Sequence, residues 1–131
     1  MIESMMLAGA LMMPKDADVP HAEYRGTHYA RKWEPFRRCV VHRESRGDYR
    51  ARNPRSSAAG AYQFLASQWR DSLVWMLMPE FGRNVRVLWR VPLHKWPALY
   101  QDAAFFTVVA QRGGWRHWYY AGSPCNRLAV R

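Results

Sequence analysis

The sequence of 131 residues has no uncharged apolar run of the ~18–20 residues that a membrane-spanning helix requires. Acids are also scarce: ten Asp and Glu stand against 20 Lys and Arg, which gives a net charge of +10. Five histidines show no paired metal-ligand spacing, so we expect neither a metal nor a cofactor. Because 49% of the residues are apolar and 15% aromatic, a disordered chain is excluded. We expect one small, soluble, globular domain.

The first 23 residues differ in composition from the rest. They hold four of the ten acids and a single base, together with the apolar stretch MMLAGALMM at 5–13. Such a stretch is typical of the core of a secretory signal, but Glu3 precedes it and no small-residue cleavage site follows. We interpret residues 1–23 as an N-terminal tail, either a degraded export signal or a loosely held segment. Residues 24–131 form the predicted domain.

The predicted domain is strongly basic, with 19 basic and six acidic side chains. A surface of this kind attracts polyanions, such as nucleic acid, an acidic membrane face or the anionic polymers of a bacterial wall. A solvated basic face with no specific partner is the alternative. Charge alone does not choose among these partners.

The spacing of apolar residues predicts three helices. The first covers about 29–46. The second has Ser67 as its N-cap and is broken by Pro79 and Gly82, and the third extends from Pro97 to Gly113. Between the first two, the sequence DYRARNPRSSAAGAYQF has the composition of turns or a short hairpin. Residues 83–96 are expected to be irregular or short helix, because Pro92 excludes a central strand. The predicted fold class is therefore α+β and mainly helical.

Glu44 stands out without reference to any family. At helical spacing it follows Phe36 and Val40 on one face, so we expect its carboxyl group to lose water, which favours the protonated form. The negative end of the helix dipole acts in the same direction, whereas Arg43 and Arg46 oppose it if they fold back. A neutral carboxylic acid is what a glycosidase uses to protonate a leaving oxygen. The alternative is a glutamate that turns outward into water.

The chain has two cysteines, Cys39 and Cys125, near opposite ends of the basic region. A disulfide between them would enclose most of the domain and would indicate an oxidising compartment. Two unrelated buried thiols are the alternative. Their spacing alone does not decide between the two.

Two segments, HRESRGDY and GAYQFLASQW, resemble the signature of the lysozyme-like lytic transglycosylases, in which a Glu-Ser pair closes a helix and a Gly-x-x-Gln stretch follows. Here the matching residues are Glu44-Ser45, Gly60 to Gln63, and then Trp69. With a Trp before the first cysteine and a terminal Trp and Cys, the chain is most similar to the resuscitation-promoting factor group of actinobacteria and their phages. In that group the first cysteine directly precedes the catalytic Glu, whereas Cys39 stands five residues before it.

The resemblance, which covers residues 33–125, implies a lysozyme-like fold with a groove beside a small hairpin. It implies that Glu44 is the single acid/base in cleavage of the β-1,4 bond between N-acetylmuramic acid and N-acetylglucosamine. The C6 hydroxyl of the sugar would attack and give a 1,6-anhydro product. A hydrolytic muramidase would need a second carboxylate. Asp48 is the nearby candidate, with a turn-capping role as the alternative.

Several residues are candidates for contact with the glycan. Gln63 is expected to face the sugar, with a plain structural role as the alternative, and Ser45 either hydrogen-bonds Glu44 or caps the helix end. Two or three of six aromatic residues are expected to line the groove, although any one of them more often belongs to a core. The six are Tyr62, Trp69, Trp115, Trp118, Tyr119 and Tyr120.

The location of the cysteines at the two ends of the resembling region leads us to predict a Cys39–Cys125 disulfide. The implied partners are peptidoglycan glycan strands and anionic wall polymers, with no specific nucleic acid, and the protein is expected to be a monomer. Its expected place is outside the cell: secreted, bound to the wall, or delivered there by a phage. A basic nucleic-acid-binding module and a non-catalytic wall-binding structural protein are the rival functions.

Overall fold

A computed structural model describes residues 19–131 of the chain. The α-helices and strands are α2 (Glu34–Ser45), β1 (Ala58–Ala59), β2 (Phe64–Leu65), α3 (Ala66–Phe81) and α4 (Ala98–Ala110). Five 3₁₀ helices complete the described part: η2 (Arg31–Trp33), η3 (Arg83–Arg90), η4 (Leu93–Lys95), η5 (Gly114–Trp118) and η6 (Pro124–Leu128). The predicted mainly helical α+β class is confirmed. No helix among residues 19–131 is both long and apolar enough to cross a membrane.

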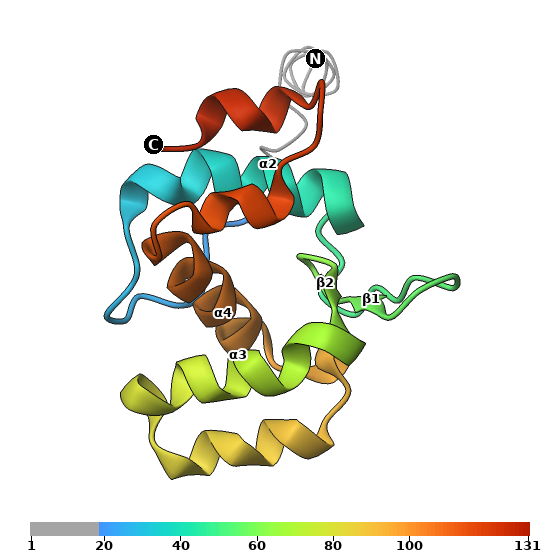
Figure 1. Ribbon diagram of the computed structural model, residues 1–131, viewed down its shortest axis with the longest axis vertical. Coiled ribbons are helices and arrows are strands. Elements are labelled where there is room, and N and C mark those ends of the chain that lie inside the picture. The colour runs from blue at the N-terminus through green and yellow to red at the C-terminus, as the bar shows by residue number, and fades with distance from the viewer. Residues whose placement is uncertain (1–18) are drawn as a thin grey trace, which may run out of the picture.

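The helices lie in two groups joined through α4 (Figure 1). One end of the molecule holds α2 with the C-terminal segment, the other holds α3 with η3, and the β1–β2 hairpin lies to one side between them. Every residue from Gln101 to Val109 is buried, so this part of α4 is enclosed on all sides and forms the centre of the core. Ala110, the last residue of α4, is exposed.

Packing of the domain begins before residue 24. Val19 is 1% exposed and Ala22 is 4% exposed, and both belong to the hydrophobic core. The Ala22 backbone N–H also donates to Glu34 Oε2 at 3.2 Å. The last part of the predicted tail, from Val19 to residue 23, therefore packs with the domain. Residues 1–18, with their apolar stretch, lie outside the described residues.

The helix that carries Glu44 ends as its sequence suggests. α2 stops at Ser45, and the next residue, Arg46, adopts the left-handed conformation with φ 55° while its N–H donates to His42 O at 3.0 Å. A left-handed residue after the last turn is a common helix terminator. The predicted end at residue 46 is thus shifted by one residue.

The second predicted helix differs more from expectation. α3 begins at Ala66, so Ser67 lies inside its first turn, and the predicted N-cap role of Ser67 is wrong. Ser67 instead hydrogen-bonds its hydroxyl to Ser57 Oγ at 2.9 Å, which ties the helix start to the hairpin. Pro79 lies within the last turn of α3 and does not break the helix, which continues to Phe81; Gly82, with φ 79°, ends it.

A buried cation joins the parts that surround the hairpin. Arg37 is fully buried; its Nε donates to Glu34 Oε1 at 2.9 Å, and one terminal nitrogen donates to Tyr62 Oη at 3.0 Å and to Tyr49 Oη at 3.2 Å. Both tyrosine hydroxyls donate in turn to Asp102 Oδ1 at 2.5 Å. Since a buried charge is costly unless it is paired, this network fixes α2, the loop after it, the hairpin turn and α4 relative to one another.

The hairpin itself is short. Ala58 pairs with Leu65 and Ala59 with Phe64 in an antiparallel ladder. The connecting turn begins at Gly60, where φ is 82° and an added Cβ would lie 2.5 Å from Gln101 Oε1. Glycine is therefore required by both backbone and space. The close approach lets Gln101 accept a hydrogen bond from the turn and hold it against α4.

Candidate functional site

Glu44 lies where a buried stripe of α2 reaches the surface. Phe36 and Val40, respectively two turns and one turn earlier on the same face, are fully buried, as the spacing predicts. The Glu44 side chain, however, is 26% exposed. The predicted loss of water from this carboxyl group is therefore wrong in degree, because the last turn of α2 extends past the core.

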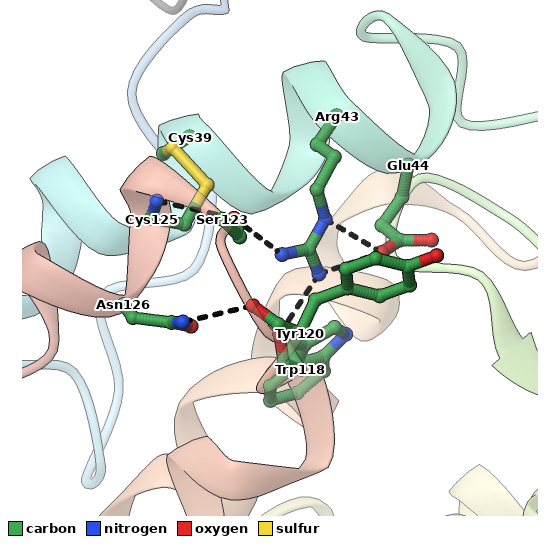
Figure 2. The surroundings of a disulfide bond; sticks show 8 residues. All are labelled: Cys39, Arg43, Glu44, Trp118, Tyr120, Ser123, Cys125 and Asn126. Carbon is green, nitrogen blue, oxygen red and sulfur yellow. Dashed lines mark hydrogen bonds and ion pairs between the residues drawn. A yellow bond between two sulfur atoms is a disulfide. The ribbon is translucent and has the colours of Figure 1, made fainter.

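Arg43 holds one oxygen of that carboxylate. Its Nε and one terminal nitrogen donate to Glu44 Oε2 at 3.0 and 2.7 Å, and the same terminal nitrogen donates to Trp118 O at 2.9 Å. The other terminal nitrogen donates to Ser123 Oγ at 3.0 Å. Figure 2 shows the Arg43 guanidinium between Glu44 and the C-terminal segment, with the Tyr120 ring beside both. No described residue hydrogen-bonds Glu44 Oε1, which is left available to a ligand.

A hollow of about 220 Å³ adjoins Glu44. Its wall comes from the end of α2, the hairpin turn, β2 and the segment 117–120. Tyr119 and Tyr120 line it and are 55% and 68% exposed, so their rings are open to a ligand. Two of the six aromatic candidates therefore lie in the hollow with accessible rings. Flat apolar rings beside a carboxyl group suit the faces of sugar rings.

Gln63 reaches the hollow from the hairpin turn. It adopts the left-handed conformation, with φ 51°, and its Nε2 donates to Gly60 O at 3.0 Å. A residue with a Cβ is strained in this conformation, and such strain is concentrated at functional sites. The turn is held from the other side by Trp118, whose Nε1 donates to Tyr62 O at 3.0 Å. Gln63 and Glu44 thus line the same hollow.

Two aromatic candidates are corrected by their surroundings. Tyr62 borders the hollow but is 1% exposed, and its hydroxyl belongs to the Arg37 network, so the predicted sugar-facing ring is wrong. Burial and the Asp102 charge raise the pKa of Tyr62, which keeps it neutral. Trp69 does not line the hollow; it packs edge-on against His117 with ring centroids 4.9 Å apart.

Trp115 and Trp118 are also buried, at 7% and 3% exposure. Trp118 borders the hollow mainly as a support for the turn, whereas Trp115 lines a different cavity. Neither presents an open ring at Glu44. Both tryptophans belong to the core, which is the alternative that the sequence left open for each aromatic candidate.

The two remaining polar candidates have local roles. Ser45 donates from its hydroxyl to Val41 O at 3.0 Å, so it closes the last turn of α2 and does not bond Glu44. Asp48 is exposed, and its Oδ1 accepts the Arg50 N–H at 2.8 Å, which is a turn-capping arrangement. The structural alternative for Asp48 is therefore the one that the structure shows.

His117 is the residue that sequence reasoning missed. It lines the hollow and packs against Phe64, Trp69 and Trp118. Burial among these rings lowers the pKa of His117 below the ordinary 6.5, so the imidazole is neutral near pH 7. A single histidine between Arg116 and Trp118 carries no motif, so the signal in the sequence was too weak to find it.

The predicted disulfide is confirmed. Cys39 in α2 and Cys125 in η6 form a bond with an S–S distance of 2.03 Å (Figure 2). The bond holds η6 against α2, and Ser123 lies two residues before Cys125. The segment that supplies Ser123 to Arg43 is therefore anchored covalently to the helix that carries Glu44.

Residues 19–131 contain no group of three His, Cys, Asp or Glu side chains arranged to hold a metal ion. Comparisons with protein-family models, with curated proteins and with solved structures found no match to this chain. The site is therefore interpreted from its own geometry.

Proposed function

We propose that this protein cleaves the β-1,4 bond between N-acetylmuramic acid and N-acetylglucosamine in peptidoglycan, with Glu44 as the acid/base. The observation that carries the proposal is Glu44 Oε1, unshared by any described side chain at the edge of a hollow lined by the open rings of Tyr119 and Tyr120. The motifs around Glu44 and Gln63 that resemble lytic transglycosylases give the same assignment from the sequence.

The geometry suits one proton carrier with a fixed position. Arg43 holds Oε2, so rotation of the carboxyl group is restricted and Oε1 keeps its direction. In the proposed reaction the Glu44 carboxyl group gives its proton to the glycosidic oxygen as the C1–O bond breaks. The C6 hydroxyl oxygen of the same sugar bonds to C1, and its proton returns to Glu44. The product is a 1,6-anhydro sugar, and no water is consumed.

Internal attack is supported by the absence of a second acid from the hollow. Glu44 is the one carboxylate among the described residues that line it, and Asp48 is engaged in a turn. An inverting hydrolase needs its two carboxyl groups ~6.5–9.5 Å apart, and a retaining one ~5 Å apart. We therefore favour the transglycosylase over the hydrolytic muramidase.

A lysozyme-like arrangement is part of the proposal. The described helices lie in two groups with a small hairpin between them, and the candidate site adjoins that hairpin (Figure 1). The disulfide is of the kind that persists in oxidising compartments, which supports action outside the cell. The proposed substrate is the glycan strand, bound by a monomer.

The test is incubation of purified peptidoglycan with the full chain, followed by mass spectrometry of the released fragments. Wild type should release 1,6-anhydro muropeptides. Glu44→Gln keeps the shape but cannot deliver the proton, so the rate should fall at least ~10²–10⁴-fold. Asp48→Asn is the matched control: it also neutralises one carboxylate near the end of α2 and should keep most of the activity.

Two outcomes would overturn parts of the proposal. Equal loss in both folded variants would indicate a two-carboxylate muramidase, and near-wild-type cleavage by Glu44→Gln would reject the assignment of Glu44.

The net charge of +10 favours a nucleic-acid-binding module as the second candidate. That function predicts salt-sensitive DNA binding with no peptidoglycan cleavage by the wild type, and a non-catalytic wall-binding protein predicts binding to peptidoglycan without cleavage.

A further inference from the structure

A second and larger cavity, of about 650 Å³, lies where the segment before α2, the C-terminal end of α4 and the end of the chain meet. It shares no lining residue with the Glu44 hollow. Its volume is within the ~300–1,000 Å³ in which proteins hold drug-sized ligands. Four cations line it, Lys32, Arg112, Arg116 and Arg131, and none of its lining residues is acidic.

The positive charge of this cavity is not balanced by the described part of the chain. Lys32 and Arg112 are exposed and form no hydrogen bond or ion pair with residues 19–131. The C-terminal end of α4 borders the cavity, but a helix end carries only about half a negative charge. Four cations exceed that negative charge even when the α-carboxylate of Arg131 is added to it, so the cavity attracts an anion with more than one charge.

The aromatic walls indicate which kind of polyanion fits. Trp115 is 7% exposed, and Arg131 and Arg116 lie over its ring at 4.7 and 5.8 Å from the centroid. Arg25 covers Tyr29 in the same way at 4.4 Å, and Trp33 is 6% exposed. Single-stranded nucleic acids bind through bases stacked on open aromatic rings. These rings are already covered, which favours a chain of phosphates without bases.

A third hollow connects this cavity to the proposed active site. It measures about 390 Å³ and is lined by Trp115, Arg116, Tyr119 and Arg131. Tyr119 also lines the Glu44 hollow, and the other three also line the basic cavity. A polymer that lies beside a glycan strand at Glu44 would therefore meet Arg116 and Arg131 in the third hollow, and these two cations also line the basic cavity with Lys32 and Arg112.

We propose that the basic cavity binds the phosphodiester chain of an anionic wall polymer, a polyol phosphate, while the Glu44 hollow holds the glycan. The choice of a wall polymer rests on the proposed function, whereas the need for a polyphosphate ligand rests on the cavity itself. Guanidinium and ammonium groups supply the donors that phosphate oxygens accept.

The experiment measures binding of purified poly(glycerol phosphate) to the full chain by calorimetry, at 50 and 200 mM salt. The test variant is Lys32→Gln with Arg112→Gln, which removes two cations that form no hydrogen bond or ion pair with residues 19–131 and should fold normally. Arg83→Gln with Arg90→Gln is the matched control, because it removes two exposed charges on η3, at the other end of the molecule (Figure 1). Thermal unfolding verifies that each variant folds.

The test variant should bind roughly fivefold to tenfold more weakly than wild type, as expected for two partly screened ion pairs. Its affinity should also depend less on salt, with a log–log slope smaller by about 1.4, and the control should match wild type in both. Equal weakening in the two variants would overturn the proposal, because it would indicate diffuse attraction. Equal binding of an oligothymidylate of the same charge would overturn the choice of polymer.

This binding assay involves no cleavage, so it is independent of the test of Glu44. Polymer binding lost in the test variant, together with no cleavage of peptidoglycan by wild type, would retain the cavity and reject the proposed function. Cleavage of peptidoglycan without specific polymer binding would retain the proposed function and reject the polymer site in the basic cavity.

Discussion

Gln63 is strained where a glycine would not be. Its left-handed backbone, with φ 51°, costs an L-residue roughly 1–2 kcal/mol, and Arg46, with φ 55°, has the same strain at the end of α2. Arg46 is exposed and does not line the Glu44 hollow, whereas Gln63 does. A comparison of substitutions at the two positions therefore distinguishes the effect of relieving backbone strain from the effect of changing a residue at the hollow.

Gln63→Gly removes the strain but also an amide side chain of a residue that lines the hollow. We expect its free energy of unfolding to stay within about 1 kcal/mol of wild type, since relief of strain offsets the lost hydrogen bond to Gly60 and the entropy of glycine. Its rate of peptidoglycan cleavage should fall about tenfold or more, because an unpaired glycan hydroxyl costs about that much. Arg46→Gly should be more stable and fully active; a fully active Gln63→Gly would exclude a role for the amide.

His117 gives the fold a sensitivity to acid. Because burial lowers its folded pKa below 6.5, the unfolded chain binds the proton more readily, and stability is fully present above pH 6.5. The contribution of His117 to stability should be lost as the pH falls from 6.5 through the lowered pKa of the folded state. His117→Phe keeps a ring among Phe64, Trp69 and Trp118 but does not titrate.

The difference between melting temperatures at pH 7.5 and pH 5 should be smaller in His117→Phe than in wild type. Differential scanning calorimetry measures both, and other acidic groups cancel in the comparison. An identical pH dependence in the two proteins would mean that His117 titrates in the same way in the folded and unfolded chains.

At the scale of elements, the disulfide connects α2 to η6 across a sequence separation of 86 residues. On the loop-entropy model a bond of this span stabilises by about 4–5 kcal/mol. Cys39→Ser with Cys125→Ser should lower the free energy of unfolding in urea by that amount. Ser123→Ala, which keeps the bond and removes the hydrogen bonds that Ser123 Oγ accepts from Arg43 and from the Cys125 N–H, should lose only ~1–2 kcal/mol. Similar losses in both would show that the bond contributes little.

The helices were predictable because their apolar spacing is regular, but their ends were not. Ser67 looks like an N-cap, yet its neighbour Ser57 in the hairpin occupies its hydroxyl, and a contact between residues ten apart has no local signal. The short strands were foreseen only as turns or a hairpin, because two residues per strand leave no alternation to detect.

At the scale of the whole molecule, the sequence indicated Glu44 and Gln63 but not the Arg37 network that places them. A fully buried arginine is unexpected from composition, and apart from Glu34 its partners Tyr62 and Asp102 come from distant segments of the chain. The exposure of Glu44 was also missed, since helical spacing shows which face a residue shares but not where the core ends. The basic cavity likewise forms only when three distant segments meet.

The loop before β1 has a consequence for proteolysis. Residues 52–56 are exposed at a tip that projects from the body of the molecule, and Arg55 offers trypsin an accessible bond (Figure 1). A cut there separates Cys39 from Cys125 along the chain, so the two fragments stay joined by the disulfide. Brief digestion should leave one band on a non-reducing gel and two on a reducing gel. The cut would also release the chain on one side of the β1–β2 hairpin. The nicked protein should therefore bind glycan more weakly, although its two fragments remain linked.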